Sequence, residues 1–357
     1  MAVTIYDLAR EAGVGIGTVS RCMNNHPSVA PGTRQRVLSI AKRLSYVPHA
    51  HAQRLASKKT NTIAMIIPYF TNYFFVKILE GVQDRASESG FDLILYGVNN
   101  PLQADEYLRK SLRRGHVDGV LFFSMRFPEA YVSKFIEIRL PLVLVDAFHP
   151  RFDSISVENR QGAVLAVRHL IRLGHRSIAM INASPDAAPA RERMEGYRLA
   201  LEEAGIPFYP SRVVVPERGR QDGFHRDTGR AGMLRILDSM RRRDRVTAVL
   251  VASDVQALGA MEAAREGGVR IPEDLAMVGF DDIDLAAQAR LTTMRQPMYE
   301  MGMLALERLM GRLREPDAPP RADSFVPELV VRHTCGAQDG AEAPSRPARN
   351  LSLGKSA

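Results

Sequence analysis

The spacing of hydrophobic residues divides the 357-residue chain into two parts that meet near residue 61. In the first part, apolar residues recur every three or four positions in short segments, which is the pattern of helices with one buried face. In the second part, short apolar runs alternate with longer helical patterns. This alternation predicts parallel sheets covered by helices on both faces.

Three short helices are predicted within residues 4–44. Thr4 and Asp7 form the S/T-x-x-D pattern of a capped first helix, which Gly13 should end. Pro31 stands where the first residue of a third helix is expected. The inward-facing residues of the second and third helices would be Val19, Cys22, Met23, Val37, Leu38, Ala41 and Leu44. Two short helices around a glycine turn are typical of a helix-turn-helix, whose second helix enters the major groove of DNA.

The second part of the chain predicts a two-lobed α/β body with parallel, doubly wound sheets. Its strands are expected at Ile63–Ile67, Leu93–Tyr96, Val120–Phe123, Leu142–Val145, Ile178–Ile181, Val249–Ala252 and Ala276–Phe280. Helices are expected between them at Phe74–Ser89, Gln161–Leu173, Met194–Ala204 and Val255–Glu266. The strands are too many for one such sheet, so we expect two lobes. Residues 334–357 are rich in Ala, Gly, Ser and Pro, which indicates a disordered tail.

Nearly all of the net positive charge lies in the first 60 residues. Nine Lys and Arg face two acids there, so 9 − 2 gives +7 of the chain's total of +8. This asymmetry indicates a module that binds a polyanion. The phosphate backbone of DNA is the obvious polyanion, because each Lys or Arg contact releases condensed counterions. The remaining residues are close to neutral and are free for another task.

Composition limits the cellular compartment in which the protein is expected and the kinds of reaction that it could catalyse. The chain has no run of about 18 apolar residues and no apolar signal segment. Its two cysteines, Cys22 and Cys335, lack metal-binding spacing and suit a reducing compartment. We therefore expect a cytoplasmic protein without a membrane partner. No catalytic residue, metal ligand or cofactor is expected, since the sequence holds no Walker loop, HExxH or G-x-S-x-G motif.

Five stretches of the basic segment carry a specific pattern. They are TIYDLAREAGV at 4–14, TVSR at 18–21, TR at 33–34, LSYVP at 44–48 and AQRLAS at 52–57. Together they resemble the DNA-binding head of the lactose-repressor (LacI/GalR) family. The resemblance implies a helix-turn-helix domain at 1–48 and a hinge helix with linker at 49–60. It also implies that the DNA-contacting residues are Thr4, Tyr6, Ile16, Gly17, Thr18, Arg21, Thr33 and Leu55.

The implied contacts differ in what they can read. Arg21 can donate two hydrogen bonds to O6 and N7 of guanine, whereas Ile16 can contact only a thymine methyl. Gly17 has no side chain that could contact a base. Base recognition should therefore depend on Arg21 and on DNA shape. The positions that the family uses to grip phosphate are Tyr6, Thr18 and Thr33.

A short hinge helix is expected at residues 50–57. Two helical turns are marginal alone in water, and the resemblance implies that this segment folds on DNA and pairs with its dimer mate. Leu55 would then wedge into the minor groove and kink the duplex, or else cover the linker against the body. His51 stands where the family commonly has an apolar residue at the contact between the two hinge helices. Protonation of two facing His51 rings would oppose hinge pairing, so operator binding is expected to weaken below about pH 6.5. The alternative is that His51 faces solvent.

The body extends the same resemblance. The matching stretches are NYFF at 72–75, VDG at 117–119, ENR at 158–160, GHR at 174–176, RERMEG at 191–196, VGFDD at 278–282, LTT at 291–293 and QP at 296–297. They imply an effector-binding and dimerisation domain at 61–333 that is similar to periplasmic sugar-binding proteins. Lobe one would comprise 61–160 plus 292–320, and lobe two 161–291 plus 321–333.

Effector-binding residues are expected in the cleft between the lobes, because ligands of doubly wound folds bind beyond the carboxyl ends of the strands. That rule selects Asp146, Ser253 and Asp281. The resemblance adds Arg193 as an effector-gripping residue and Phe74 and Phe224 as flanking aromatic residues. Carboxylates with one arginine suit the paired hydroxyls of a sugar, and an aromatic ring suits its apolar face.

Several neighbours of these candidates have simpler explanations. Asp254 is expected to be a helix cap or a contact between lobes, Asp282 a helix N-cap and Phe75 a core residue. The first cleft loop, PYFT at 68–71, lacks the acid that relatives usually carry there. The identity of the effector therefore does not follow from the resemblance.

These observations give three hypotheses for the function. The first is a homodimeric repressor of carbohydrate-related genes that binds a palindromic operator and is controlled by a sugar or sugar derivative. Binding of this effector would rotate the lobes and change the spacing of the two hinges. The second is a catabolite-control-type regulator, indicated by QPMYEMG at 296–302 and corepressed by a serine-phosphorylated phosphocarrier protein. Arg308 and Arg312 would pair the phosphoserine, or be solvated helix charges. The third is an enzyme, but GVGIG at 13–17 fails the G-x-G-x-x-G spacing.

Overall fold

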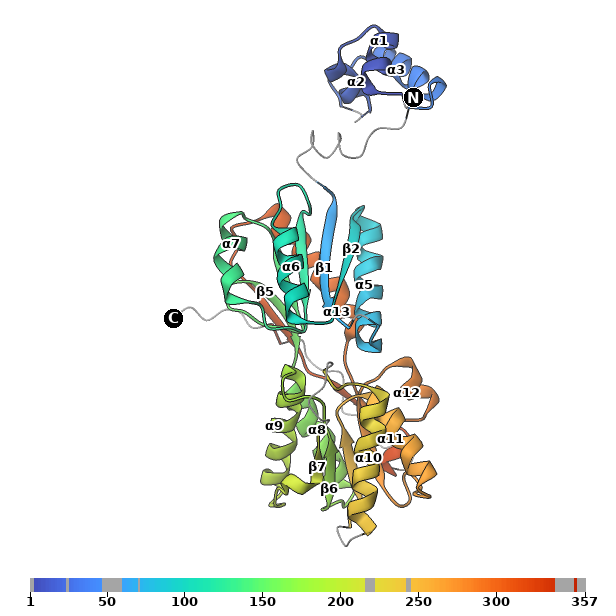
Figure 1. Cartoon of the computed structure of the whole chain (residues 1–357), viewed down its shortest axis with the longest axis vertical. Helices are drawn as coiled ribbons and strands as arrows, with labels where there is room; N and C mark the ends of the chain where they lie inside the picture. The colour runs from blue at the N-terminus through green and yellow to red at the C-terminus, as the bar shows by residue number, and fades with distance from the viewer. Residues whose placement is uncertain are drawn as a thin grey trace. The chain divides into compact units, whose positions relative to one another are not determined.

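The computed structural model describes residues 3–23, 26–46, 60–69, 71–215, 222–241, 245–337 and 350–351. They belong to two compact units, one within residues 1–60 and one within residues 61–357 (Figure 1). Residues 49–59 of the predicted hinge helix and linker at 49–60, which include His51 and Leu55, lie outside the described residues. Among the helices that the model describes, none is long and apolar enough to cross a bilayer.

The first unit is a three-helix bundle. Its helices are α1 Ile5–Ala12, α2 Ile16–Met23 and α3 Pro31–Arg43. Thr4 caps α1 in a capping box with Asp7, and Gly13 ends the helix in the left-handed conformation at φ +63°, both as predicted. The fully buried core residues are Leu8, Val19 and Val37. Leu38 was predicted to be buried but is 43% exposed, because Val37 and Ala41 already take the inward positions of α3.

The first lobe of the second unit is built on a seven-stranded sheet. Its elements are β1 Thr62–Pro68, α5 Tyr73–Ser89, β2 Asp92–Val98, α6 Pro101–Ser111, β3 Gly119–Phe123, α7 Val132–Glu137, β4 Leu142–Val145, β5 Asp153–Val157, α13 Met298–Arg314, β11 Ala322–Phe325 and β13 Asn350–Leu351. The strand order is β13-β11-β5-β4-β3-β1-β2, and only β13 pairs antiparallel.

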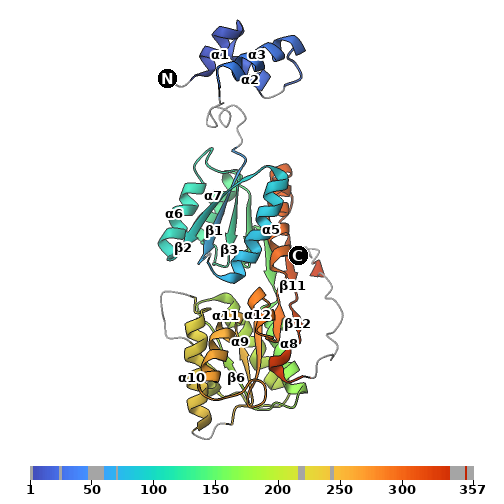
Figure 2. The same ribbon diagram turned by 90° about the vertical axis from the view of Figure 1, so that its right-hand side faces the viewer.

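Alternate residues of β1 pack on opposite faces of this sheet. Ile63, Met65 and Ile67 pack with α5 and α13, whereas Ala64 and Ile66 pack with α6 and α7. Figures 1 and 2 show these two helical layers on either side of the sheet. A strand buried on both faces is uniformly apolar, which is why its sequence predicted a parallel sheet.

The second lobe is built on a six-stranded sheet. Its elements are α8 Asn159–Arg172, β6 Ile178–Ile181, α9 Ala188–Glu203, β7 Val213–Val214, α10 Arg226–Arg241, β8 Ala248–Val251, α11 Asp254–Glu266, β9 Ala276–Asp281, α12 Asp284–Gln288, β10 Thr293–Arg295 and β12 Glu328–Val330. The strand order is β12-β10-β9-β8-β6-β7, with β12 antiparallel to β10. The two lobes confirm the predicted α/β fold class.

The chain passes between the lobes after β5, between β10 and α13, and between β11 and β12. Two predicted lobe boundaries were therefore wrong. Residues from 292 were assigned to lobe one, but β10 belongs to the second sheet. Residues from 321 were assigned to lobe two, but β11 pairs with β5 in the first sheet. Strands of three or four residues are too short to show a recognisable period.

The predicted start of the tail at residue 334 was also wrong. Residues 333–335 form a short 3-10 helix in which Thr334 and Cys335 are buried. The hydroxyl of Thr334 donates to the carbonyl of Met277 at 2.9 Å and accepts from the N–H of Thr292 at 2.9 Å. The ordered body therefore includes residues up to 337, while residues 338–349 and 352–357 lie outside the described part of the chain.

Candidate functional site

The exposed face of α2 presents the residues predicted to read bases. Ile16 is 40% exposed, and Gly17 and Arg21 are also exposed. The guanidinium of Arg21 lies over Gly17, so that a Cβ at that glycine would sit 3.9 Å from Arg21 Nη2. The opposite face buries Val19 and Cys22 against the other helices. The second helix therefore offers an arginine and an apolar side chain from a rigid support.

The charge of this unit is positive on its described surface. Residues 3–23 and 26–46 hold six Lys and Arg and two acids, which gives 6 − 2 = +4. Both acids are already paired: Arg10 lies 2.8 Å from Asp7 and Arg43 lies 2.6 Å from Glu11. An approaching phosphate would therefore meet a cationic surface whose acids are neutralised.

The predicted phosphate contacts are placed differently. Tyr6 is 68% exposed on α1, and Thr33 is half-buried in the first turn of α3, where free backbone N–H groups attract anions. Thr18 is half-buried on α2. Thr4 is exposed, but its hydroxyl donates to Asp7 Oδ2 at 2.7 Å and accepts from the Asp7 N–H. Its main role in this structure is to cap α1.

In the second unit, Arg193 is the centre of a buried polar cluster. It is 4% exposed, and its Nε donates to Asn159 Oδ1 at 3.0 Å. Its Nη1 donates to the carbonyl of Ala252 and lies 3.8 Å from Asp281 Oδ1. The guanidinium also stacks 3.7 Å from the ring centre of Phe280. The arginine is thus fixed before any ligand arrives.

Three aspartates near this arginine are hard to ionise. Burial raises the pKa of Asp281 to about 7 and that of Asp146 to about 6, although the charge of Arg193 acts in the opposite direction on both. Burial also raises the pKa of Asp254 well above its usual value, and the neighbouring Asp281 adds to this. Carboxyl groups that are buried beside one guanidinium are poised to accept hydrogen bonds from hydroxyl groups.

Two of these aspartates sit on strained backbone where strands end. Asp281, the last residue of β9, has φ +124°, and Asp146, which follows β4, has φ +53°. Asp146 accepts from Ser124 Oγ at 2.7 Å, and Asp281 accepts from Gln296 Nε2 at 2.6 Å. Non-glycine residues in left-handed backbone cluster at functional sites because surrounding contacts hold them there.

Other candidates have structural contacts that explain them. Ser253 is buried and accepts from the N–H of Gln256 as the N-cap of α11. Asp254 accepts from Thr293 Oγ1 at 2.6 Å and from the Ile283 N–H at 3.1 Å, all within lobe two, so it is neither a cap nor a contact between lobes. Phe75 is a core residue, 4% exposed, as the simpler explanation held.

The structure shows specific contacts for Asp282 and Phe74 that differ from their expected roles. Asp282 is not a helix cap, because it forms ion pairs with Arg295 at 2.7 Å and Arg332 at 2.6 Å. Phe74 is half-buried and lies edge-on to Phe75 at 5.2 Å between ring centres. Its ring belongs to the margin of the lobe-one core rather than to the lining of the cavity described next.

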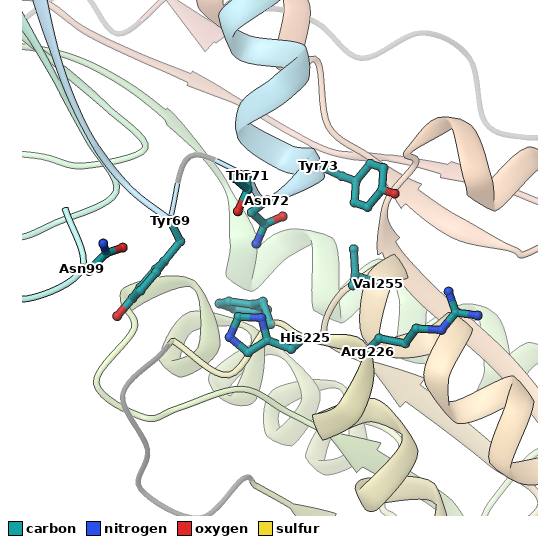
Figure 3. Close-up of a pocket in the computed structure, with 9 residues that line it drawn as sticks. Tyr69, Thr71, Asn72, Tyr73, Asn99, His225, Arg226 and Val255 are labelled. Atoms are coloured by element: carbon teal, nitrogen blue, oxygen red, sulfur yellow. The ribbon is translucent and has the colours of Figure 1, made fainter. Parts of the chain in front are cut away.

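A cavity of about 410 Å³ lies between the lobes. Figure 3 shows Tyr69 and Asn72 on one side of it and His225 on the other. Its lining is Tyr69, Thr71, Asn72, Tyr73 and Asn99 from lobe one and Phe224, His225, Arg226 and Val255 from lobe two. Of the six predicted effector-binding residues, Phe224 alone is part of this lining, and its ring centre lies 5.5 Å from the guanidinium of Arg193.

The sequence interpretation missed Tyr69, Asn99 and His225. Tyr69 directly follows β1 and Asn99 directly follows β2, so the strand-end rule that selected Asp146 also applies to them. A tyrosine or an asparagine at a strand end is a weaker indication of a ligand contact than the carboxylate or serine at the predicted positions. His225 stands next to Phe224 in the turn before α10, and no local pattern marks it.

Arg308 and Arg312 on α13 are neither solvated nor available for a phosphoserine. Arg312 Nε lies 2.5 Å from Asp153 Oδ2, and Arg308 forms an ion pair with Asp323. Both aspartates are nearly fully buried, at 1% and 4% exposure. The two arginines therefore tie α13 to β5 and β11.

Both units are similar to parts of known regulatory and binding proteins. Residues 4–49 match the family model for bacterial regulatory proteins of the lacI family, and residues 167–335 match a periplasmic binding protein-like domain. Catabolite control protein A of Priestia megaterium is 34% identical over 93% of this chain and 98% of its own length.

Two solved structures extend the similarity to three dimensions. The complex of the transcriptional regulator CelR with cellobiose is 31% identical, with a TM-score of 0.68 over 93% of this chain and 99% of that one. The Lac repressor dimer bound to operator and the anti-inducer ONPF is 26% identical, with a TM-score of 0.79 over 94% of this chain and 100% of that one.

Proposed function

This chain belongs to the lacI family of bacterial regulatory proteins, and from that premise we propose that it is a homodimeric repressor of carbohydrate-related genes. Its first unit binds a palindromic operator, and a sugar in the cleft of its second unit changes the affinity for that operator. The observation that carries this proposal is the pairing of a cationic helix-turn-helix with a cleft that holds buried carboxyl groups beside Arg193.

DNA recognition by α2 is supported by the exposure of Arg21 and Ile16 on one face of the helix. The operator can be found by selecting bound duplexes from a random pool, followed by fluorescence anisotropy of the selected duplex at several salt concentrations. Arg21→Ala should weaken discrimination between selected and random duplex by about 1–3 kcal/mol, since a bidentate contact to guanine is lost.

Arg10→Ala is the matched control for this experiment. The Arg10 side chain is 82% exposed and is paired with Asp7 on α1, away from the base-reading face of α2. Its loss should weaken binding to all duplexes alike or leave it unchanged. If Arg21→Ala behaves in the same way as Arg10→Ala, Arg21 does not read a base and the proposed recognition is wrong.

A sugar effector is supported by the chemistry of the Arg193 cluster and by the cellobiose in the related CelR complex. Carboxyl oxygens at Asp146 and Asp281 can accept from sugar hydroxyls, and an arginine can donate to them. A thermal-shift screen of sugars with the full chain, followed by operator binding with each hit, tests this. Hits should lose their effect in Arg193→Met. A hit that acts equally on that variant binds elsewhere.

Dimerisation follows from the operator geometry that we propose. A palindromic site has two half-sites about one helical turn apart, and each must meet its own head. The Lac repressor comparison structure is a dimer on operator. Sedimentation of the chain with a selected duplex should give two chains for each duplex. One chain for each duplex would contradict the homodimer.

A phosphocarrier corepressor is the second candidate, because catabolite control protein A is a relative at 34% identity. The ion pairs of Arg308 and Arg312 with Asp323 and Asp153 speak against the contact first considered for it. A pull-down with the serine-phosphorylated and the unphosphorylated carrier separates the candidates. Retention of only the phosphorylated form would favour this alternative.

A further inference from the structure

The cleft of the second unit holds a buried polar cluster and, next to it, a cavity. The inner cluster consists of Arg193, Asp281 and Asp146. The outer cavity is the space of about 410 Å³ whose lining was given above. Phe224 joins the two, because its ring lines the outer cavity and lies 5.5 Å from the Arg193 guanidinium. A ligand that contacts both the inner cluster and the outer cavity would therefore have to pass Phe224.

The size of the outer cavity indicates a second unit of ligand. Pockets of about 300 Å³ or more hold drug-sized ligands. The outer cavity reaches 410 Å³ without any contribution from Arg193, Asp281 or Asp146, since none of them is part of its lining. A single small ring on the inner cluster would leave this space unused.

The lining of the outer cavity suits an uncharged polar ring. Tyr69 and Tyr73 offer aromatic faces, and Asn99 offers an amide that can both donate and accept. The Nε2 atom of His225 is buried, lies 3.6 Å from Asp222 Oδ1 and has no hydrogen-bond partner among the residues that the structure describes. A ligand hydroxyl is a suitable partner for such a nitrogen.

The charges around this cavity argue against an anionic ligand. Among the described lining residues, Arg226 alone carries a permanent charge, and it is already paired with Glu262, with 2.9 Å between Arg226 Nε and Glu262 Oε2. Asp222 beside His225 would repel a phosphate, and so would the carboxyl groups of the inner cluster. The outer cavity thus selects a neutral group.

Resting on the proposed function, we propose that the effector is an uncharged disaccharide, with one ring on the inner cluster and the second ring in the outer cavity. Tyr69, Asn99 and His225 are then the residues that determine specificity for the second ring. They lie on three different segments: the turn after β1, the end of β2 and the turn before α10. Two of them belong to lobe one and one to lobe two, so the second ring contacts both lobes.

The test is isothermal titration of the full chain with neutral disaccharides (cellobiose, maltose, lactose, sucrose), with their constituent monosaccharides and with glucose 6-phosphate. At least one disaccharide should bind about tenfold or more tightly than its monosaccharides. Tyr69→Ala and His225→Ala should each weaken that disaccharide by about tenfold and leave monosaccharide binding unchanged. Asn99→Ala should act in the same direction. Tyr209→Ala, an exposed tyrosine outside the lining, is the matched control.

The outcomes separate this inference from the proposed function. Monosaccharides that bind as tightly as every disaccharide would overturn the inference and leave a sugar effector in place. An equal loss of affinity for mono- and disaccharides in Tyr69→Ala and His225→Ala would overturn the assignment of the two rings to the inner cluster and the outer cavity. Preferred binding of glucose 6-phosphate would overturn the claim of an uncharged ligand. Failure of every sugar to bind would overturn the proposed effector class together with the inference.

Discussion

Replacing Asp281 with asparagine should stabilise the protein while weakening its response to effector. Asp281 is 5% exposed, and burial raises its pKa from 3.8 to about 7 in the folded chain. The folded state therefore holds this proton more tightly than the unfolded state does. The stability that the neutral form provides is fully present below about pH 4 and is lost as the pH rises through about 7. Asparagine has the same shape and cannot ionise.

The size of the effect follows from the surroundings of the carboxyl group. A pKa raised from 3.8 to about 7 corresponds to about 4 kcal/mol at pH 8. The variant loses the 3.8 Å ion pair with Arg193, which retains the charges of Asp146, Glu192 and Asp254. This loss offsets part of the gain, and we expect a net stabilisation of about 1–2 kcal/mol at pH 8 and none at pH 4.

Thermal unfolding of the effector-free chain at pH 5 and pH 8 measures this. The melting temperature of Asp281→Asn should exceed that of the wild type by several degrees at pH 8 and by less at pH 5. Asp274→Asn is a control of opposite sign, because its exposed pair with Arg270 lowers the pKa of Asp274 to about 2. If Asp281→Asn melts at or below the wild-type temperature at pH 8, the claim that this carboxyl is buried at a cost is refuted.

Two further predictions concern the framework of the second unit. Gly81→Ala should destabilise it by about 1–3 kcal/mol, because a Cβ at Gly81 would stand 2.1 Å from a backbone oxygen of α13. Gly311 on α13 has open space around it, so Gly311→Ala should be neutral or stabilising. Chemical denaturation of both variants measures the two free energies of unfolding. Arg312→Met should cost about 3–5 kcal/mol in the same assay, since it strands the buried Asp153, whereas Arg168→Met breaks an exposed pair and should cost less than about 1 kcal/mol. Equal costs for the two arginine variants would contradict the structural role of Arg312.

The parts of the fold that could be predicted from the sequence are those that local pattern determines. β1, β3 and β4 are continuous apolar runs because both faces of the sheet are covered. β5 was missed because its sequence, DSISV, is largely polar. Its first residue, Asp153, is buried with partners that are distant in the chain: Arg312 on α13, 159 residues away, and the backbone N–H of Arg321. A partner so distant leaves no trace in the local pattern.

The candidate site divides in the same way. Asp146 and Asp281 could be found because strand ends in a doubly wound sheet converge on one edge. Ser253 meets the same rule and is an N-cap, since a strand that leads directly into a helix needs one at that position. The outer cavity could not be predicted, because it depends on how the turn after β1 faces the turn before α10 across the cleft.

Under the proposed function, the arrangement of the inner cluster would allow a sugar to act on the shape of the second unit. Asp146 belongs to lobe one, whereas Arg193 and Asp281 belong to lobe two. A ligand that bonds to only one lobe would have equal affinity for every lobe arrangement and would shift nothing. Moving an equilibrium from 1:99 to 99:1 requires about 5.5 kcal/mol of differential affinity. Hydrogen bonds to charged groups contribute about 1.5–3 kcal/mol each, so two to four bonds made in only one arrangement are enough. In the proposed complex, Asp146 would supply such bonds at the inner cluster, and Tyr69 and Asn99 would supply the remainder at the outer cavity. The second ring of the effector and the strength of the response should therefore change together.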